Sequence, residues 1–152
     1  MKVLNGKYGK VLFCDCMDQQ YGLPSIAANS IDLCFTDPPY NIASDSKNYA
    51  SDVSKSMNDL KNSEWDHNFN IEPPILNTLN FSKESSTFMI WTSTFLFERI
   101  TNCIKPFCDF TSYLVWNKPN PMPSLSKRHP TWNTELCVYG SRGSKRTINF
   151  SL

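Results

Sequence analysis

The sequence has few glycines, little charge and no long hydrophobic run. Only 5 of the 152 residues are glycine and 19% are charged. No apolar run approaches the roughly 18 residues that a membrane-spanning helix needs. The stretch 1–6 also lacks the apolar segment of a secretory signal peptide. We therefore expect a soluble, cytoplasmic protein with no membrane partner.

The six cysteines have neither the spacing nor the context of a metal site. A single residue separates Cys14 from Cys16, where most zinc knuckles have two, and Cys103 and Cys108 have no second pair nearby. Without a secretory signal, disulfide bonds are not expected. The sequence therefore predicts no metal, and it predicts cysteines that are mostly buried as small hydrophobic side chains.

The composition is that of one folded domain with an uneven charge distribution. Hydrophobic residues make up 40% of a 17.4 kDa chain, which excludes disorder throughout. Residues 1–98 hold 7 Lys or Arg against 12 Asp or Glu, whereas residues 99–152 hold 8 against 2. A basic second half favours a polyanionic partner such as nucleic acid, although exposed Lys and Arg are common on any domain.

Short apolar runs alternate with helical patterns along the chain. The expected strands are 11–14, 31–36, 87–91, 110–116 and 135–139, and the expected helices are 73–79 and 94–100, with one or two helical turns before residue 24. Residues 41–70 are rich in Ser, Asn, Asp and Lys, and they predict a mobile loop with a helical turn near 57–60. The alternation predicts a single α/β domain over 1–152, with a mostly parallel sheet covered by helices.

The strand 31–36 runs directly into Asp37-Pro38-Pro39-Tyr40-Asn41. Two prolines cannot continue a central ladder, so this segment is expected to be a loop at the carboxyl end of the strand. Open α/β sheets bind their ligands at that place. The Asp37 carboxylate and the Pro38 carbonyl can accept hydrogen bonds from an exocyclic amine, and Tyr40 offers a face for ring stacking. The pattern predicts a site for a planar amine.

Residues 31–41 resemble the catalytic motif of amino-group DNA methyltransferases, the enzymes of adenine N6 and cytosine N4. Residues 9–16 look like the Gly-Asp-Cys segment of this family, with Cys14 where glycine is usual, and 114–120 and 134–140 are similar to two later segments. The resemblance covers 9–143. It implies a Rossmann-like methyltransferase fold, S-adenosylmethionine as cofactor, double-stranded DNA as substrate, and a prokaryotic or phage origin, with the restriction-linked and orphan roles left open.

The resemblance also implies roles for individual residues. Asp37, Pro38, Pro39 and Tyr40 are expected to be catalytic, and Asp37 and Asp15 to contact the cofactor; Asp15 alternatively only ends a strand. An aspartate at position 37 is typical of the adenine enzymes, which implies methyl transfer to N6 of a flipped adenine. Cytosine N4, or an amine in RNA or protein, is the alternative substrate.

Substrate contacts are expected from aromatic and basic side chains. The expected residues are Tyr40, Asn41, Trp132, Lys118, Lys127 and Arg128. Asn41 alternatively only fixes the turn, and each basic side chain is alternatively a solvated surface charge. Trp91 and Trp116 lie in apolar strands and are expected in the core.

The family's glycine-rich cofactor turn, Asp/Phe-x-Phe-x-Gly-x-Gly, is absent from the sequence. In relatives whose Asp-Pro-Pro-Tyr motif comes early, this turn and the base-reading segment follow later in the chain. The fold is therefore expected to be incomplete, with missing strands that would lie beside 31–36 and whose absence exposes an apolar edge. We interpret the chain as the catalytic amino-terminal part of a larger methylase, inactive by itself. The alternatives are one half of a split enzyme that needs a complementing chain, and a non-catalytic remnant that binds DNA or a partner.

Overall fold

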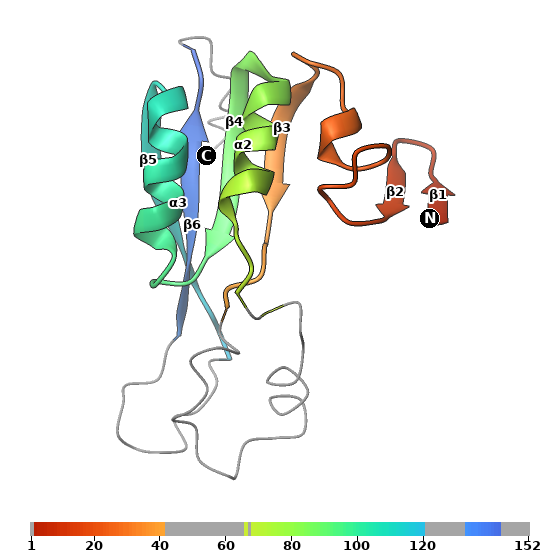
Figure 1. The fold of residues 1–152 in the computed structure, drawn as a ribbon. Helices are drawn as coiled ribbons and strands as arrows, with labels where there is room; N and C mark the ends of the chain where they lie inside the picture. Colours follow the sequence, from red (N-terminus) through yellow and green to blue (C-terminus); the bar gives the residue numbers. More distant parts are fainter. Residues whose placement is uncertain (1, 42–65, 67, 121–132, 144–152) are drawn as a thin grey trace.

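The computed structural model describes residues 2–41, 66, 68–120 and 133–143 (Figure 1). The main sheet consists of β3 (Ile31–Thr36), β4 (Ser82–Thr92), β6 (Thr134–Ser141) and β5 (Phe110–Asn117), in that spatial order. The other elements are the hairpin strands β1 (Lys2–Asn5) and β2 (Lys10–Phe13), the helices α2 (Glu72–Phe81) and α3 (Phe97–Ile104), and the 3₁₀ turns η1 (Leu23–Ser25) and η4 (Lys105–Phe107). None of the described helices is long and apolar enough to cross a membrane.

The strand directions differ from the mostly parallel sheet that the sequence predicts. Only β3 and β4 pair in parallel, whereas β6 is antiparallel to both of its neighbours. β3, β4 and β5 therefore all run in one direction, and β6 returns between β4 and β5. The prediction of a mostly parallel sheet is wrong because the direction of a strand depends on which distant segments pair with it, and β6 pairs with both β4 and β5 as an antiparallel neighbour.

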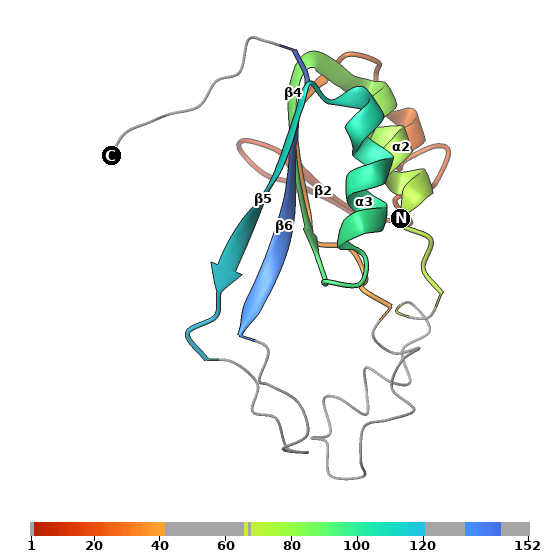
Figure 2. The same cartoon turned by 90° about the vertical axis from the view of Figure 1, so that its left-hand side faces the viewer.

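Both helices pack on the same face of the sheet (Figures 1 and 2). The core consists of Ile71, Ile75 and Leu79 around α2, Ile100 and Ile104 on α3, Phe88 and Ile90 on β4, and Val138 on β6. The core residues at α2 and at α3 recur every four positions, which places them on one side of each helix. Burial of each such side chain contributes about 1.5–3 kcal/mol. The expectation of helical cover is confirmed for this face.

No described helix covers the opposite face of the sheet. Trp91 and Trp116 meet there edge to face, with ring centroids 6.0 Å apart. Trp116 is 47% exposed to solvent, so the expectation that it lies in the core is wrong. Apolar strands are buried only where a second layer packs on them, and in the described residues that layer is present on one side alone (Figure 2).

The hairpin and the cysteines are more exposed than the sequence suggests. β2 is a strand, as expected, but every residue of β1 and β2 is exposed. All six cysteines are free thiols, and Cys137 alone is fully buried, whereas Cys14 and Cys16 are exposed. The prediction of mostly buried cysteines is therefore wrong, because Cys14 and Cys16 follow a hairpin that does not join the main sheet.

The helix boundaries shift by a few residues from their expected places. α2 carries prolines in its first turn, as predicted. α3 begins only at Phe97, because a turn closed by the Leu96 N–H and the Ser93 carbonyl (3.3 Å) precedes it. The core of the expected mobile loop, residues 42–65 and 67, with its turn near 57–60, lies outside the described residues.

Gly140 allows α3 to approach β6 closely. An added methyl group at this position is therefore expected to lower the free energy of unfolding. A Cβ at Gly140 would lie 2.8 Å from Ile104 Cδ1 and 2.9 Å from Cys108 Sγ, whereas a Cβ at Gly9 would meet nothing within 4 Å. We expect Gly140→Ala to lower the free energy of unfolding by about 1–3 kcal/mol. Gly9→Ala should leave it unchanged or raise it slightly. Urea titrations of both variants would check this, and equal midpoints would contradict it.

Candidate active site

The site lies at the edge of the sheet where the parallel strands end. β3 ends at Thr36, and Asp37 to Tyr40 form the loop that the two prolines predict. Because β3, β4 and β5 run in the same direction, Asp37 shares this edge with Lys118, which directly follows β5. β6 runs the other way, so its first residues, including Glu135, lie at the same edge. Groups that are distant in the sequence thus lie at the same edge of the sheet as Asp37.

A short hydrogen bond joins the two central side chains of the loop. The Tyr40 hydroxyl donates to Asp37 Oδ1 at 2.6 Å. Burial raises the pKa of Tyr40 far above its ordinary value, and the hydrogen bond to Asp37 and the negative charges of Asp37 and Glu135 raise the pKa further. Tyr40 therefore remains a neutral donor at every physiological pH. Asp37 is exposed, and its second carboxylate oxygen is available to another donor.

Asn41 fixes the end of the loop to the segment before α2. Its backbone has a left-handed φ of 57°, its side-chain amide donates to the Phe69 carbonyl (2.9 Å), and its Oδ1 accepts the Phe69 N–H (2.7 Å). The Asn41 N–H donates to the carboxylate of Asp66 (2.9 Å), a side chain that is only 2% exposed. The sequence analysis missed Asp66, because nothing in the local pattern links it to a residue 25 positions earlier.

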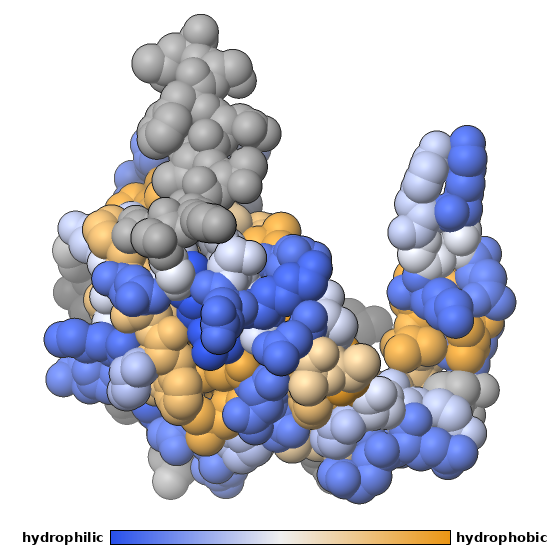
Figure 3. Space-filling model, turned by 90° about the horizontal axis from the view of Figure 1, so that it is seen from above, coloured by the Kyte–Doolittle hydropathy of each residue, from blue (hydrophilic) through white to orange (hydrophobic). Residues whose placement is uncertain are grey.

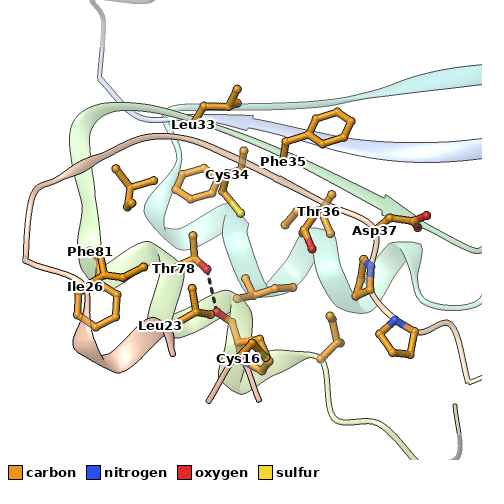
Figure 4. A pocket seen from close by; sticks show the side chains of 18 of the residues that line it. Cys16, Leu23, Ile26, Leu33, Cys34, Phe35, Thr36, Asp37, Thr78 and Phe81 are labelled. Atoms are coloured by element: carbon orange, nitrogen blue, oxygen red, sulfur yellow. Dashed lines mark hydrogen bonds between the residues drawn. The ribbon is translucent and has the colours of Figure 1, made fainter. Parts of the chain in front are cut away.

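An apolar cavity of about 480 Å³ runs along β3 toward Asp37 (Figure 4). It is lined by Cys16, Leu23 and Ile26 from the amino-terminal segment, by Ile31 and 33–39 of β3 and its loop, by Phe69, Ile71, Pro74, Ile75, Thr78 and Phe81, and by Phe88 and Ile90. Cys34 and Thr36 point into it, whereas Leu33 and Phe35 point away (Figure 4). Burial raises the pKa of the Cys34 thiol. The cavity therefore offers mainly apolar contact, with carboxylate chemistry at its Asp37 end.

Asp15 does not line this cavity, although the following residue, Cys16, does. Asp15 is exposed, and its Oδ1 accepts the Met17 N–H at 2.8 Å, so that one carboxylate oxygen holds the local turn. Of the two carboxylates expected to contact the cofactor, the structure therefore places Asp37 in the cavity lining and Asp15 next to a residue of the lining.

The basic and aromatic residues expected to contact substrate divide into two groups. Lys118 pairs with Glu135, and its Nζ lies 5.8 Å from the centroid of the Trp116 ring. Glu135 balances that charge, a role the sequence analysis did not assign to it, although it lies in the segment 134–140 that is similar to one of the later family segments. Lys127, Arg128 and Trp132 lie outside the described residues. Within the described ranges, no three or more His, Cys, Asp or Glu side chains group as metal ligands.

Comparison with known proteins identifies the family. The sequence model of the DNA methylase family that comprises N6 and N4 enzymes matches residues 31–151. The chain therefore belongs to this family of DNA amino-methyltransferases. The type II methyltransferase M2.MboI of Moraxella bovis is 29% identical over 126 residues, which are 77% of this chain and 45% of that protein.

Two crystal structures show the same fold at low sequence identity. The M1.HpyAVI complex with S-adenosylmethionine has a TM-score of 0.50 and 17% identity, over 75% of this chain and 45% of that chain. The structure of M1.HpyAVI has a TM-score of 0.50 and 19% identity, over 75% and 46%. The expected family and the expected partial Rossmann-like methyltransferase fold are confirmed. The chain spans less than half the length of these relatives.

Because of the hydrogen bonds of Asn41, we expect its replacement to destabilise the protein more than the replacement of Asn68. Asn68 has the same left-handed backbone (φ 55°), and its side chain is exposed. Alanine strains the backbone at both positions by about 1–2 kcal/mol, but only Asn41→Ala also leaves the Phe69 peptide groups unpaired. We expect Asn41→Ala to lower the free energy of unfolding by about 1–3 kcal/mol more than Asn68→Ala. Equal effects in urea titration would contradict the role given to Asn41.

Proposed function

We propose that this chain carries the catalytic loop of a DNA methyltransferase that transfers a methyl group from S-adenosylmethionine to N6 of a flipped adenine. The observation that supports it most directly is the exposed Asp37 carboxylate at the end of β3, oriented by Tyr40 and followed by two prolines. Membership of the DNA methylase family supplies the reaction class. The choice of adenine rests on aspartate at position 37.

The residues of the loop suit an exocyclic amine. The free oxygen of Asp37 and the Pro38 carbonyl can each accept one N–H, which turns the nitrogen lone pair out of conjugation with the ring. As the nitrogen gains positive charge during transfer, these two acceptors bind it more strongly, and the transition state is stabilised relative to the bound base. Tyr40, held by its hydroxyl, presents a ring face for stacking. Positioning and electrostatics are sufficient, with no covalent intermediate on the protein.

The described residues fit S-adenosylmethionine in part. An apolar cavity with the Asp37 carboxylate in its lining suits a ligand that combines polar donors with an apolar ring. Asp37 and, beside the lining residue Cys16, Asp15 are the residues that would contact it. M1.HpyAVI, which has the same fold, was crystallised with this molecule. The cofactor supplies an activated methyl group on a sulfonium. The glycine-rich turn is absent from these 152 residues, so we propose that full cofactor binding requires further protein.

Replacement of Asp37 tests the catalytic assignment. In an assembly that transfers tritiated methyl groups from S-adenosylmethionine to DNA, we expect Asp37→Ala to lower the rate about 10²–10³-fold, because it removes an acceptor for the developing charge. Asp32→Ala is the matched control, since Asp32 lies on β3, the strand that leads into Asp37, its side chain is 71% exposed, and it pairs with Lys83, which is 41% exposed. The control should retain activity within about twofold.

Nucleoside analysis of the methylated DNA distinguishes the target atoms. N6-methyladenine would support the proposal, and N4-methylcytosine would contradict the choice of adenine while leaving the reaction class intact. Methylation that is equally reduced by Asp37→Ala and Asp32→Ala would contradict the role of Asp37. If DNA binds but no methyl transfer occurs in any assembly, the chain is a binding remnant rather than an enzyme.

Two substitutions at Tyr40 separate stacking from hydrogen bonding. Tyr40→Phe keeps the ring and removes the hydroxyl that contacts Asp37, whereas Tyr40→Ala removes both. Because base stacking contributes about 1–3 kcal/mol, we expect Tyr40→Ala to weaken binding of DNA at the target base by about 5–150-fold and Tyr40→Phe by less than about fivefold. Fluorescence of 2-aminopurine at the target position would measure this. Equal losses in the two variants would show that the ring face does not bind the base.

A further inference from the structure

Asp66 is a buried acidic side chain beside the catalytic loop, and it has no part in the reaction proposed above. It is 2% exposed, and among the described residues it is the only acidic or basic side chain in the buried set. Burial of a carboxyl group costs free energy unless hydrogen bonds replace those lost to water. Asp66 Oδ1 accepts the N–H of Asn41 at 2.9 Å. The burial of Asp66 is therefore coupled to a contact with the end of the loop.

The N–H that Asp66 accepts belongs to the peptide bond between Tyr40 and Asn41. Because a peptide bond is planar, the direction of this N–H also sets the direction of the Tyr40 carbonyl. The left-handed φ of Asn41, 57°, turns the chain directly after that peptide. Tyr40 is thus held at two points, by Asp37 at its hydroxyl (2.6 Å) and by Asp66 at the following peptide.

The segment that carries Asp66 is anchored in the core. Phe69 packs against the core cluster, and Ile71, directly before α2, is 2% exposed. Phe69 also shares two hydrogen bonds with the Asn41 side chain, at 2.9 and 2.7 Å. The hairpin of β1 and β2, by contrast, forms a sheet of its own and projects from the main body across open space (Figure 3). The position of Asp66 therefore follows from the packing before α2 and not from the hairpin.

We propose that Asp66 is a positioning residue for methyl transfer, which holds the peptide after Tyr40 and thereby fixes the orientation of the Tyr40 ring against the flipped base. Asp66 is not among the residues that line the cavity, and in this role it acts through Tyr40 alone. A misplacement of about 1 Å in a positioning contact can slow a reaction about 100-fold. The proposal rests on the proposed function, because the orientation of the Tyr40 ring matters to the rate only if the ring stacks on a base.

Two substitutions at Asp66 test the hydrogen bond to the loop. Asp66→Ala removes the acceptor, whereas Asp66→Asn keeps an oxygen that can accept the Asn41 N–H. In an assembly that transfers methyl groups to DNA, with both substrates saturating, we expect Asp66→Ala to lower kcat about 10–100-fold. Asp66→Asn should lower kcat less than about threefold, because the acceptor is retained. Equal losses in the two variants would overturn the proposal.

Asn68→Ala and Gly140→Ala are the matched controls. Asn68 lies in the same segment as Asp66 and has an exposed side chain, and Gly140 lies near the end of β6 that is farther from Asp37. Both substitutions strain the fold without removing the bond between Asp66 and the loop. At a temperature at which thermal melts show every variant folded, each control should keep kcat within about twofold. A loss in either control as large as that of Asp66→Ala would mean general destabilisation and would overturn the proposal.

A double-mutant cycle with Tyr40 identifies the route by which Asp66 acts. Once the ring is removed by Tyr40→Ala, a residue that acts through this ring has little left to position. We therefore expect Asp66→Ala to lower kcat less than about threefold in the Tyr40→Ala background. A loss of about 10–100-fold in that background would show that Asp66 acts by another route, and it would overturn the proposal.

Amide exchange tests the geometry without the reaction. Asp66→Ala should speed exchange of the Asn41 N–H about tenfold or more, and it should leave the amides of Phe88 and Ile90 on β4 unchanged. Unchanged exchange at Asn41 would overturn the proposal and leave the proposed function intact. Faster exchange at Asn41, together with no methyl transfer in any assembly, would refute the proposed function and make Asp66 a purely structural residue.

Discussion

The parallel pairing of β3 with β4 is the constraint on which the site depends. Cys34 and Thr36 lie opposite Phe88 and Ile90 in this ladder, and the two β4 side chains are buried beneath α2 and α3. The last pair of the ladder, Thr36 with Ile90, fixes the point at which Asp37 leaves the sheet. Core packing fixes β4, and the pairing with β4 fixes the end of β3. The position of Asp37, which follows β3, is therefore fixed as well, although its side chain is exposed.

Beyond the ladder, local hydrogen bonds replace sheet pairing as the source of order. The prolines restrict the backbone and remove donors, and Tyr40 binds back to Asp37 three residues earlier. Asn41 then joins the loop to Phe69 and to the buried Asp66, just before α2. The segment directly before the helix α2 therefore holds the far end of the loop. This arrangement pre-organises a carboxylate without burying it, and Asp37 stays accessible.

The two faces of the main sheet are packed to different extents. The face of the sheet under α2 and α3 has a compact core, whereas the opposite face leaves the Trp91 and Trp116 pair half open and the β3 edge has no described neighbour. These open surfaces keep large apolar side chains such as Leu33, Phe35 and Trp116 accessible to solvent.

Local sequence patterns predict the strands of the main sheet and the place of the loop after β3. Apolar runs located β3, β4, β5 and β6, the prolines located the loop after Thr36, and the motif around Asp37 identified the family, because each of these depends on neighbouring residues alone. Only the tertiary structure decided the antiparallel insertion of β6, the exposure of Trp116 and of the hairpin, and the meeting of Glu135 with Lys118 and of Asn41 with Asp66. Strand direction and burial depend on which distant segments pack together, and no local pattern records that.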